Sequence, residues 1–155
     1  MNRLLLLLML ASLSLAENYT FLVNKYDKEM ELEAEILSKI ATASSKEPIT
    51  LYIPDISPTE AKVYGRFFTL TPECRHATFV FINKATATAE ASCDPSEKLF
   101  FTNNYRRLLA DEKFFGAFFW AKSRPNIVFL QHRLLQHDIT LPKTYSRYIE
   151  ELNVQ

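Results

Sequence analysis

The sequence predicts an α/β domain: a three-layer sandwich with a mixed, mainly parallel sheet of about five strands, followed by a C-terminal β-hairpin and a helix. Helical and strand-like segments alternate from residue 28 to residue 110, which is typical of parallel strands joined by crossover helices. The aromatic stretch that follows has the pattern of two strands joined by a turn, which predicts an antiparallel hairpin at the edge of the sheet.

Residues 1–16 have the pattern of a cleavable signal peptide. A basic residue, Arg3, precedes an apolar run of about eight residues, and small residues stand at Ser14 and Ala16. The run is far shorter than the ~20 apolar residues that a membrane-spanning helix needs. We therefore expect cleavage after Ala16, a mature single domain over residues 17–155, and a periplasmic or secreted location.

The first half of the mature chain has clear helix and strand signals. Asp27 is a candidate N-cap before apolar residues at helical spacing. Pro54 ends a β-rich run, and Ser57 with Glu60 forms the pattern of a capping box with proline at the first helical position. The predicted elements are a helix over residues 28–43, a strand over 49–53, a helix over 58–67 and a strand over 77–82.

The second half predicts the remaining strands and three short helical segments. Asn103 or Asn104 can cap a helix after a third apolar strand, and Leu141-Pro142 introduces the last helix. Ser123–Asn126 contains the turn residues of the hairpin. The predicted elements are a strand over 99–102, a helix over 105–110, hairpin strands over 116–122 and 127–130, a helical turn over 133–136 and a helix over 143–152.

Composition excludes several functional classes. The chain has 18 basic and 18 acidic residues, a neutral balance that argues against a general nucleic-acid binder. Glycine occurs only at Gly65 and Gly116, so the glycine-rich loops that cradle phosphates are absent and we expect no nucleotide cofactor. Acidic residues dominate from 17 to 60 and basic ones from 98 to 147. This asymmetry indicates either two solvated faces or a basic surface that meets an acidic partner.

Cys74 and Cys93 are the only cysteines, and in an exported protein such a pair predicts a disulfide. A catalytic thiol is the alternative, although no C-x-x-C motif is present. The three histidines lack the spacing of a metal site, and no sequence motif of a hydrolase occurs. We therefore predict no metal, no cofactor, no catalytic residues and no enzymatic activity, although a spatial triad would leave no local motif.

The hairpin segment contains the candidate binding residues Trp120, Lys122 and Arg124. A buried strand accounts for its many phenylalanines, but less easily for an indole beside two cations. Strand alternation predicts that Phe118, Trp120 and Lys122 share one face, with Arg124 at the turn. Tryptophan and arginine are frequent anchors of protein interfaces, so this edge is a candidate docking surface.

The chain from Cys74 onward resembles the YfiR-like periplasmic proteins. The similar segments are the lead-in to residues 77–82, Gly116 at the start of the hairpin, the return strand 127–129, and the stretch from Arg133 to Leu141. The chain departs from the family in the residues that follow the return strand, in the absence of a Trp-Pro after the first helix, and in having cysteines for one disulfide. The resemblance implies an exported α/β domain that restrains an inner-membrane diguanylate cyclase by binding its periplasmic part.

These observations favour a non-enzymatic exported module that recognises another protein. An inner-membrane signalling protein is one candidate partner, and a second copy of the chain is another. A small solute-binding domain is the first alternative, which predicts a concave pocket lined by Tyr, Trp and Arg. A hydrolase with a dispersed site is the second alternative, which predicts a nucleophile within reach of a histidine.

Overall fold

The computed structural model describes residues 27–84 and 93–152. The chain divides into two compact units, Met1–Leu32 and Glu33–Gln155. In the first unit, residues 27–32 are described and are helical; the second unit contains helical residues 33–44 and the sheet. The predicted signal peptide and its cleavage site lie outside the described residues. Within the described ranges, no helix is long and apolar enough to cross a membrane.

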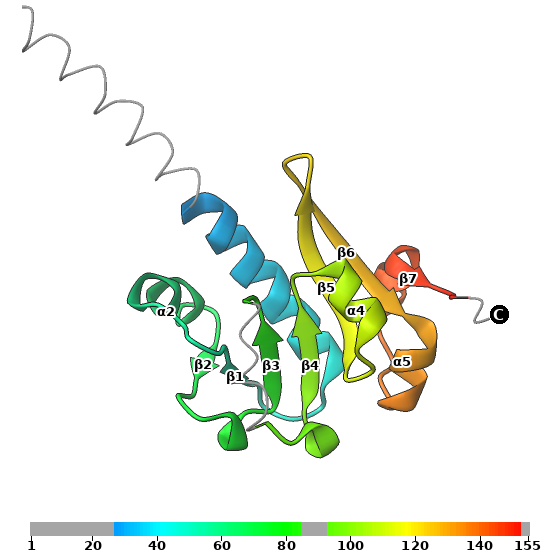
Figure 1. Cartoon of the computed structure of the whole chain (residues 1–155), viewed down its shortest axis with the longest axis horizontal. Helices are drawn as coiled ribbons and strands as arrows, with labels where there is room; N and C mark the ends of the chain where they lie inside the picture. Colours follow the sequence, from blue (N-terminus) through cyan, green and yellow to red (C-terminus); the bar gives the residue numbers. More distant parts are fainter. Residues whose placement is uncertain (1–26, 85–92, 153–155) are drawn as a thin grey trace, which may run out of the picture. The chain divides into compact units, whose positions relative to one another are not determined.

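The second unit is built on a seven-stranded sheet with the order β2-β1-β3-β4-β5-β6-β7 (Figure 1). Every neighbouring pair is parallel except β5 and β6, which form the antiparallel hairpin. The predicted α/β class with a mixed, mainly parallel sheet is confirmed. The strands are β1 (Thr50–Tyr52), β2 (Thr69–Leu70), β3 (Phe79–Ile82), β4 (Leu99–Thr102), β5 (Phe114–Ala121), β6 (Arg124–Leu130) and β7 (Ile149–Glu150).

Short helices connect these strands, and most follow the predicted caps. The Ser57 side chain accepts from the backbone of Glu60, whose carboxylate accepts from the backbone of Ser57, so the predicted capping box is present. The Asn104 side chain accepts from the backbone N–H of Arg107. The helices are α2 (Pro58–Tyr64), α4 (Tyr105–Ala110) and α5 (Gln131–Gln136), with 3₁₀ turns η1 (Cys74–His76), η2 (Pro95–Glu97) and η3 (Lys143–Tyr148).

The predicted C-terminal helix over residues 143–152 is wrong. Residues Lys143–Tyr148 form a 3₁₀ turn, and Ile149–Glu150 then pair with β6 as a parallel strand. Tyr145 does not lie on an amphipathic helix face; its ring meets that of Phe129 edge-on, with centroids 5.8 Å apart. The hairpin is therefore not the edge of the sheet along its whole length, and the sheet has seven strands rather than about five.

One face of the sheet is lined by phenylalanine rings. The Phe101 ring lies 5.2 Å from that of Phe115 and 6.0 Å from that of Phe129, measured between centroids. A register shift between β4 and β5 leaves Phe115 without a partner on β4, and its ring also stacks on Phe129. Helix α2 lies on this face, because the ring of Tyr64 contacts that of Phe81.

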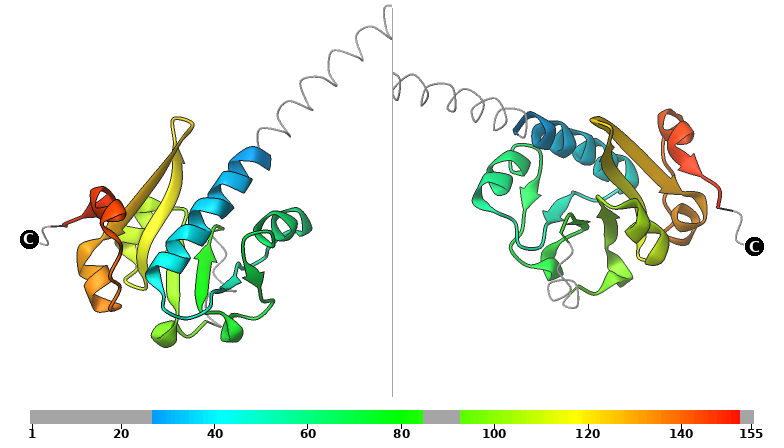
Figure 2. Two further views of the ribbon diagram at one scale, coloured as in Figure 1. Left: turned by 180° about the vertical axis from the view of Figure 1, so that it is seen from behind. Right: turned by 45° about the horizontal axis from the view of Figure 1, so that its top comes forward.

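The opposite face has a separate core that includes the disulfide. Cys74 and Cys93 are bonded, with Cα atoms 5.5 Å apart, as the sequence predicts. Both are buried in a cluster with Val80 of β3, Phe100 of β4 and Leu108 of α4. The sheet is therefore covered by α2 on one face and by α4 on the other, which is the arrangement of a three-layer sandwich (Figure 2).

Candidate functional site

The hairpin of β5 and β6 extends beyond its neighbouring strands (Figures 1 and 2). The last pair between β4 and β5 is Thr102–Ala117, and β7 pairs with β6 only at Phe129 and Leu130. Residues 118–128 therefore form a two-stranded ribbon that projects from the sheet. At its end, Lys122, Ser123, Arg124 and Pro125 are exposed. We refer to residues 121–125 as the hairpin tip.

The tip turns in two residues, and both have a left-handed backbone. Lys122 has a φ of 51° and Ser123 a φ of 58°, which is the geometry of a type I′ turn. Neither residue is the Asn or Gly that such a turn favours. A left-handed backbone costs about 1 kcal/mol or more for an ordinary residue. The predicted turn at Ser123–Asn126 lies two residues too far along the chain, because Arg124 and Asn126 pair with β5.

The two cations of the tip are unpaired. Within residues 27–84 and 93–152, the side chains of Lys122 and Arg124 take part in no hydrogen bond or ion pair. Strand alternation predicts that Lys122 shares a face with Phe118 and Trp120. In the structure β5 ends at Ala121 and Lys122 lies in the turn, so this prediction is wrong. The backbone carbonyl of Arg124 accepts from the Asn126 side chain at 2.9 Å. The tip therefore presents two exposed positive charges, one in the turn and one directly after it.

Trp120 lies at the base of the tip and faces inward. Its ring meets that of Phe118 edge-on, with centroids 5.7 Å apart, and its side chain is half-buried. Trp120 is also one of the groups that lower the pKa of Glu33, which lies in the helical segment 33–44. Trp120 is paired with Pro125 across the hairpin. In a hairpin with a two-residue turn this pair exchanges no backbone hydrogen bonds. Pro125 has no N–H, but its absence therefore leaves no backbone group of β5 without a hydrogen-bond partner.

Glu33 accepts a hydrogen bond from another element. The hydroxyl of Tyr64 on α2 donates to its carboxylate. Burial raises the pKa of Glu33 above its ordinary value, Tyr64 and Trp120 lower it by less, and the charge of Glu60 raises it further. Neither Glu33 nor Tyr64 was predicted from the sequence to belong to a site. The signal in the sequence was that Glu33 stands next to the apolar face of the predicted helix over residues 28–43, which contains Leu37.

A second acidic residue, Glu60, is held at the carboxyl ends of β1 and β3. Burial alone would raise its pKa, but hydrogen bonds from Lys84 and from Ser57 lower it overall. Lys84 donates to Glu60 at 2.9 Å and to the backbone carbonyl of Asp55 at 2.8 Å. The strand order reverses here, because β2 and β3 lie on opposite sides of β1. Ligands often bind at such a point in an open sheet. Here Glu60 and Lys84 bind each other instead, and Glu60 also caps the start of α2.

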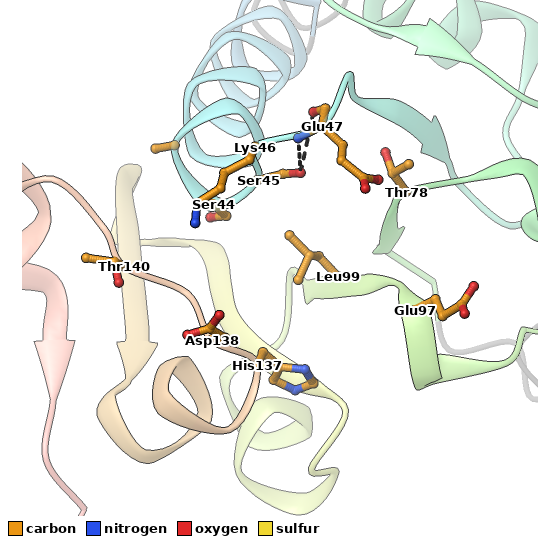
Figure 3. Close-up of a pocket in the computed structure, with 11 residues that line it drawn as sticks. Ser44, Ser45, Lys46, Glu47, Thr78, Glu97, Leu99, His137, Asp138 and Thr140 are labelled. Carbon is orange, nitrogen blue, oxygen red and sulfur yellow. Dashed lines mark hydrogen bonds between the residues drawn. The ribbon is translucent and has the colours of Figure 1, made fainter.

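At the opposite, amino ends of the strands lies an open cleft of about 430 Å³ (Figure 3). Most of its hydroxyls are already bonded to the backbone: that of Ser44 donates to the carbonyl of Ile40 at 2.8 Å, and that of Thr78 accepts from the N–H of Thr50 at 2.9 Å. The solute-binding alternative predicts a pocket lined by Tyr, Trp and Arg. The lining of this cleft contains none of these three residue types. The cleft is lined by Ala43, Ser44, Ser45, Lys46, Glu47, Thr78, Glu97, Leu99, His137, Asp138 and Thr140.

His137 is the histidine of this cleft. Burial lowers its pKa, so the ring is neutral near neutral pH, and one ring N–H donates to the backbone of Glu112. Its Nε2 atom is buried and has no hydrogen-bond partner among the described residues. A second open cleft, of about 450 Å³, lies beside Cys74 and includes Tyr52 and Arg75, but Arg75 is already paired with Glu73.

Comparison with known protein families, with curated proteins and with solved structures returns no match. Among residues 27–84 and 93–152, no group of three or more His, Cys, Asp or Glu side chains is arranged to hold a metal ion. The structure therefore brings Trp120, Lys122 and Arg124 to one end of a single projecting ribbon, and it joins Tyr64 of α2 to Glu33 by a hydrogen bond.

Proposed function

We propose that the mature protein is an exported, non-enzymatic binding module that recognises an acidic surface of another protein through the hairpin tip. The observation that carries the proposal is the turn itself. Two consecutive residues, neither of them glycine, hold left-handed backbone at an exposed tip; one of them is the cation Lys122, and the cation Arg124 follows directly. Strained backbone of this kind clusters at binding and active sites.

The chemistry of the tip defines the partner. Lys122 and Arg124 are exposed donors that have no acceptor among the residues that the structure describes, so carboxylates of the partner would satisfy them. The resemblance to YfiR-like proteins supports the periplasmic part of an inner-membrane signalling protein as that partner. A second copy of the chain is the other candidate, and the molecular mass of the isolated protein in solution distinguishes the two.

Substitution of the tip cations tests this proposal. We expect Arg124→Ala and Lys122→Ala each to weaken partner capture from intact membranes of the source organism by roughly 30-fold, because truncating an interface anchor costs about 2 kcal/mol. The midpoint of thermal unfolding should not change, because an exposed cation contributes little to stability. Raising the ionic strength should weaken capture by the wild-type protein.

Lys143→Ala is the matched control, because Lys143 is an exposed cation far along the chain in η3. It should capture the partner as the wild-type protein does. Undiminished capture by both tip variants would exclude the hairpin tip as the binding site. Unfolding of Arg124→Ala would show that the residue is structural.

A further inference from the structure

We propose that the chain associates head to tail in solution: the hairpin tip of one copy enters the open cleft at the amino ends of the strands of the next copy. The inference rests on the proposed function, because it uses the same tip, and it develops the candidate of a second copy as partner. It adds an acceptor site on this chain and a form of regulation, since a tip held by a neighbouring copy is not available to another protein.

The cleft carries a surplus of negative charge. Three exposed acidic residues line it, and among the described residues no hydrogen bond or ion pair engages their carboxylates. One cation, Lys46, lines the same cleft (Figure 3). The helical segment 33–44 also ends here, and the carbonyl groups at the end of a helix favour positive charge. The three acidic residues are Glu47, Glu97 and Asp138.

A buried nitrogen in the lining of the cleft lacks a partner. His137 is partly buried there, whereas the acidic residues are exposed. Its Nε2 atom is buried and has no hydrogen-bond partner among residues 27–84 and 93–152. Buried polar atoms are rarely left without a partner in folded proteins. The cleft therefore combines free carboxylates with unused hydrogen-bonding capacity, which suits a cationic donor.

The tip is the complement of the cleft in charge and in shape. Three carboxylates against one ammonium group leave two negative charges in the cleft, and Lys122 and Arg124 give the tip two positive charges. The ribbon of residues 118–128 is two strands wide and extends beyond its neighbours, so its tip can enter a cleft. The chain has 18 basic and 18 acidic residues, so its copies repel one another little.

Tip and cleft lie at opposite ends of the sheet (Figure 1). Thr78 stands just before β3 and Leu99 begins β4, so the cleft is at the amino ends of the strands. The tip follows the carboxyl end of β5, which is parallel to β4. The tip therefore cannot reach the cleft of its own chain. Contact between two different surfaces is heterologous, and it either closes into a ring or continues as an open chain.

Sedimentation equilibrium of the mature protein tests the association. We expect the average mass to rise with protein concentration. It should fall toward that of the monomer as the ionic strength is raised, because exposed charges make the contact. A protein that stays monomeric at low ionic strength up to ~1 mM, the weak end of specific binding, would overturn the proposal.

Two double variants identify the two surfaces. The tip variant is Lys122→Gln with Arg124→Gln, and the cleft variant is Glu47→Lys with Glu97→Lys. Asp138 is kept, because its φ of 53° suits aspartate. Each variant alone should be monomeric. An equal mixture should form a heterodimer and nothing larger, because only one intact tip and one intact cleft remain. A mixture that stays monomeric, or a cleft variant that associates as the wild-type protein does, would contradict the proposal.

Glu112→Lys with Glu151→Lys is the matched control for the cleft variant. It changes the net charge by the same amount at exposed positions that do not line the cleft. It should associate as the wild-type protein does, and all three variants should keep the wild-type midpoint of thermal unfolding. Equal loss of association in this control would show that net charge, and not the cleft, governs the association.

Partner capture from membranes separates this proposal from the proposed function. The cleft variant keeps its tip, so it should capture the partner at least as well as the wild-type protein, because no second copy competes. Loss of capture by the cleft variant would contradict the role of the cleft in self-association. A monomeric wild-type protein that still captures the partner would refute self-association and leave the proposed function in place. The proposed function fails separately, if Arg124→Ala captures the partner fully.

Discussion

At the scale of single residues, Gly116 is needed because two rings occupy the space where a side chain would be. A Cβ atom built on Gly116 would lie 2.5 Å from Cε2 of Phe101 and 2.8 Å from Cδ1 of Phe129. Its backbone has a negative φ, so steric room and not turn geometry explains the glycine. The structure gives this glycine a packing role at the start of the hairpin.

Gly116→Ala should therefore destabilise the fold. We expect a loss of about 1–3 kcal/mol in the free energy of unfolding, because the core must be overpacked to admit a methyl group. Chemical denaturation of the purified protein measures this. Adding Phe101→Leu should recover part of the loss, since it removes the closer ring. An unchanged free energy in the single variant would contradict the packing account.

At the scale of elements, the hairpin combines a stable base with a strained end. Its base is buried, with Phe115, Phe118 and Phe129 fully covered. Its tip is exposed and turns through Lys122 and Ser123 with left-handed backbone. The hairpin was predicted because its strands are rich in aromatic residues. The position of the turn was missed because Lys-Ser is not a type I′ sequence, while Pro125 and Asn126 resemble turn residues but lie in β6.

Replacing the turn by Lys122→Asn with Ser123→Gly should stabilise the protein. Asn-Gly adopts this backbone without the cost that Lys-Ser bears, so we expect a gain of about 1–2 kcal/mol in unfolding free energy. The same variant should lose partner capture, because it lacks the Lys122 cation. Lys122→Ala with Ser123→Ala is the control for the lost side chains, and it should show no gain in stability. A double variant no more stable than the wild-type protein would show that the turn is not strained.

At the scale of the whole molecule, the alternation of helices and strands was enough to predict an α/β sheet. Local signals such as Ser57, Asn104 and Pro54 placed its first elements correctly. The two-residue strands β2 and β7 were not predicted, because so few residues carry no periodic pattern. The last helix was predicted wrongly because pairing with β6 outweighed local helix preference. Glu33 could not be linked to Tyr64, since only the fold brings residues so distant in sequence together.

The disulfide connects the lead-in of β3 to the segment before β4. It closes a loop with a sequence separation of 19 residues, which in the chain-entropy model stabilises the fold by about 3 kcal/mol. We expect Cys74→Ala with Cys93→Ala to lower the midpoint of thermal unfolding by roughly 10 °C. Thiol titration of the denatured, unreduced wild-type protein should find no free thiols. Two free thiols, or equal midpoints, would contradict a stabilising bridge.

The central claim is that the hairpin tip contacts a partner protein. Its most direct test is site-specific photo-crosslinking in the source organism, with the reactive residue at Ser123 of the tip or, as a control, at Leu135, which is 73% exposed on α5. We predict one major crosslinked protein from position 123, absent from position 135 and lost when Arg124→Ala is added. Crosslinking from position 135 alone, or a product from position 123 that Arg124→Ala does not reduce, would contradict the account.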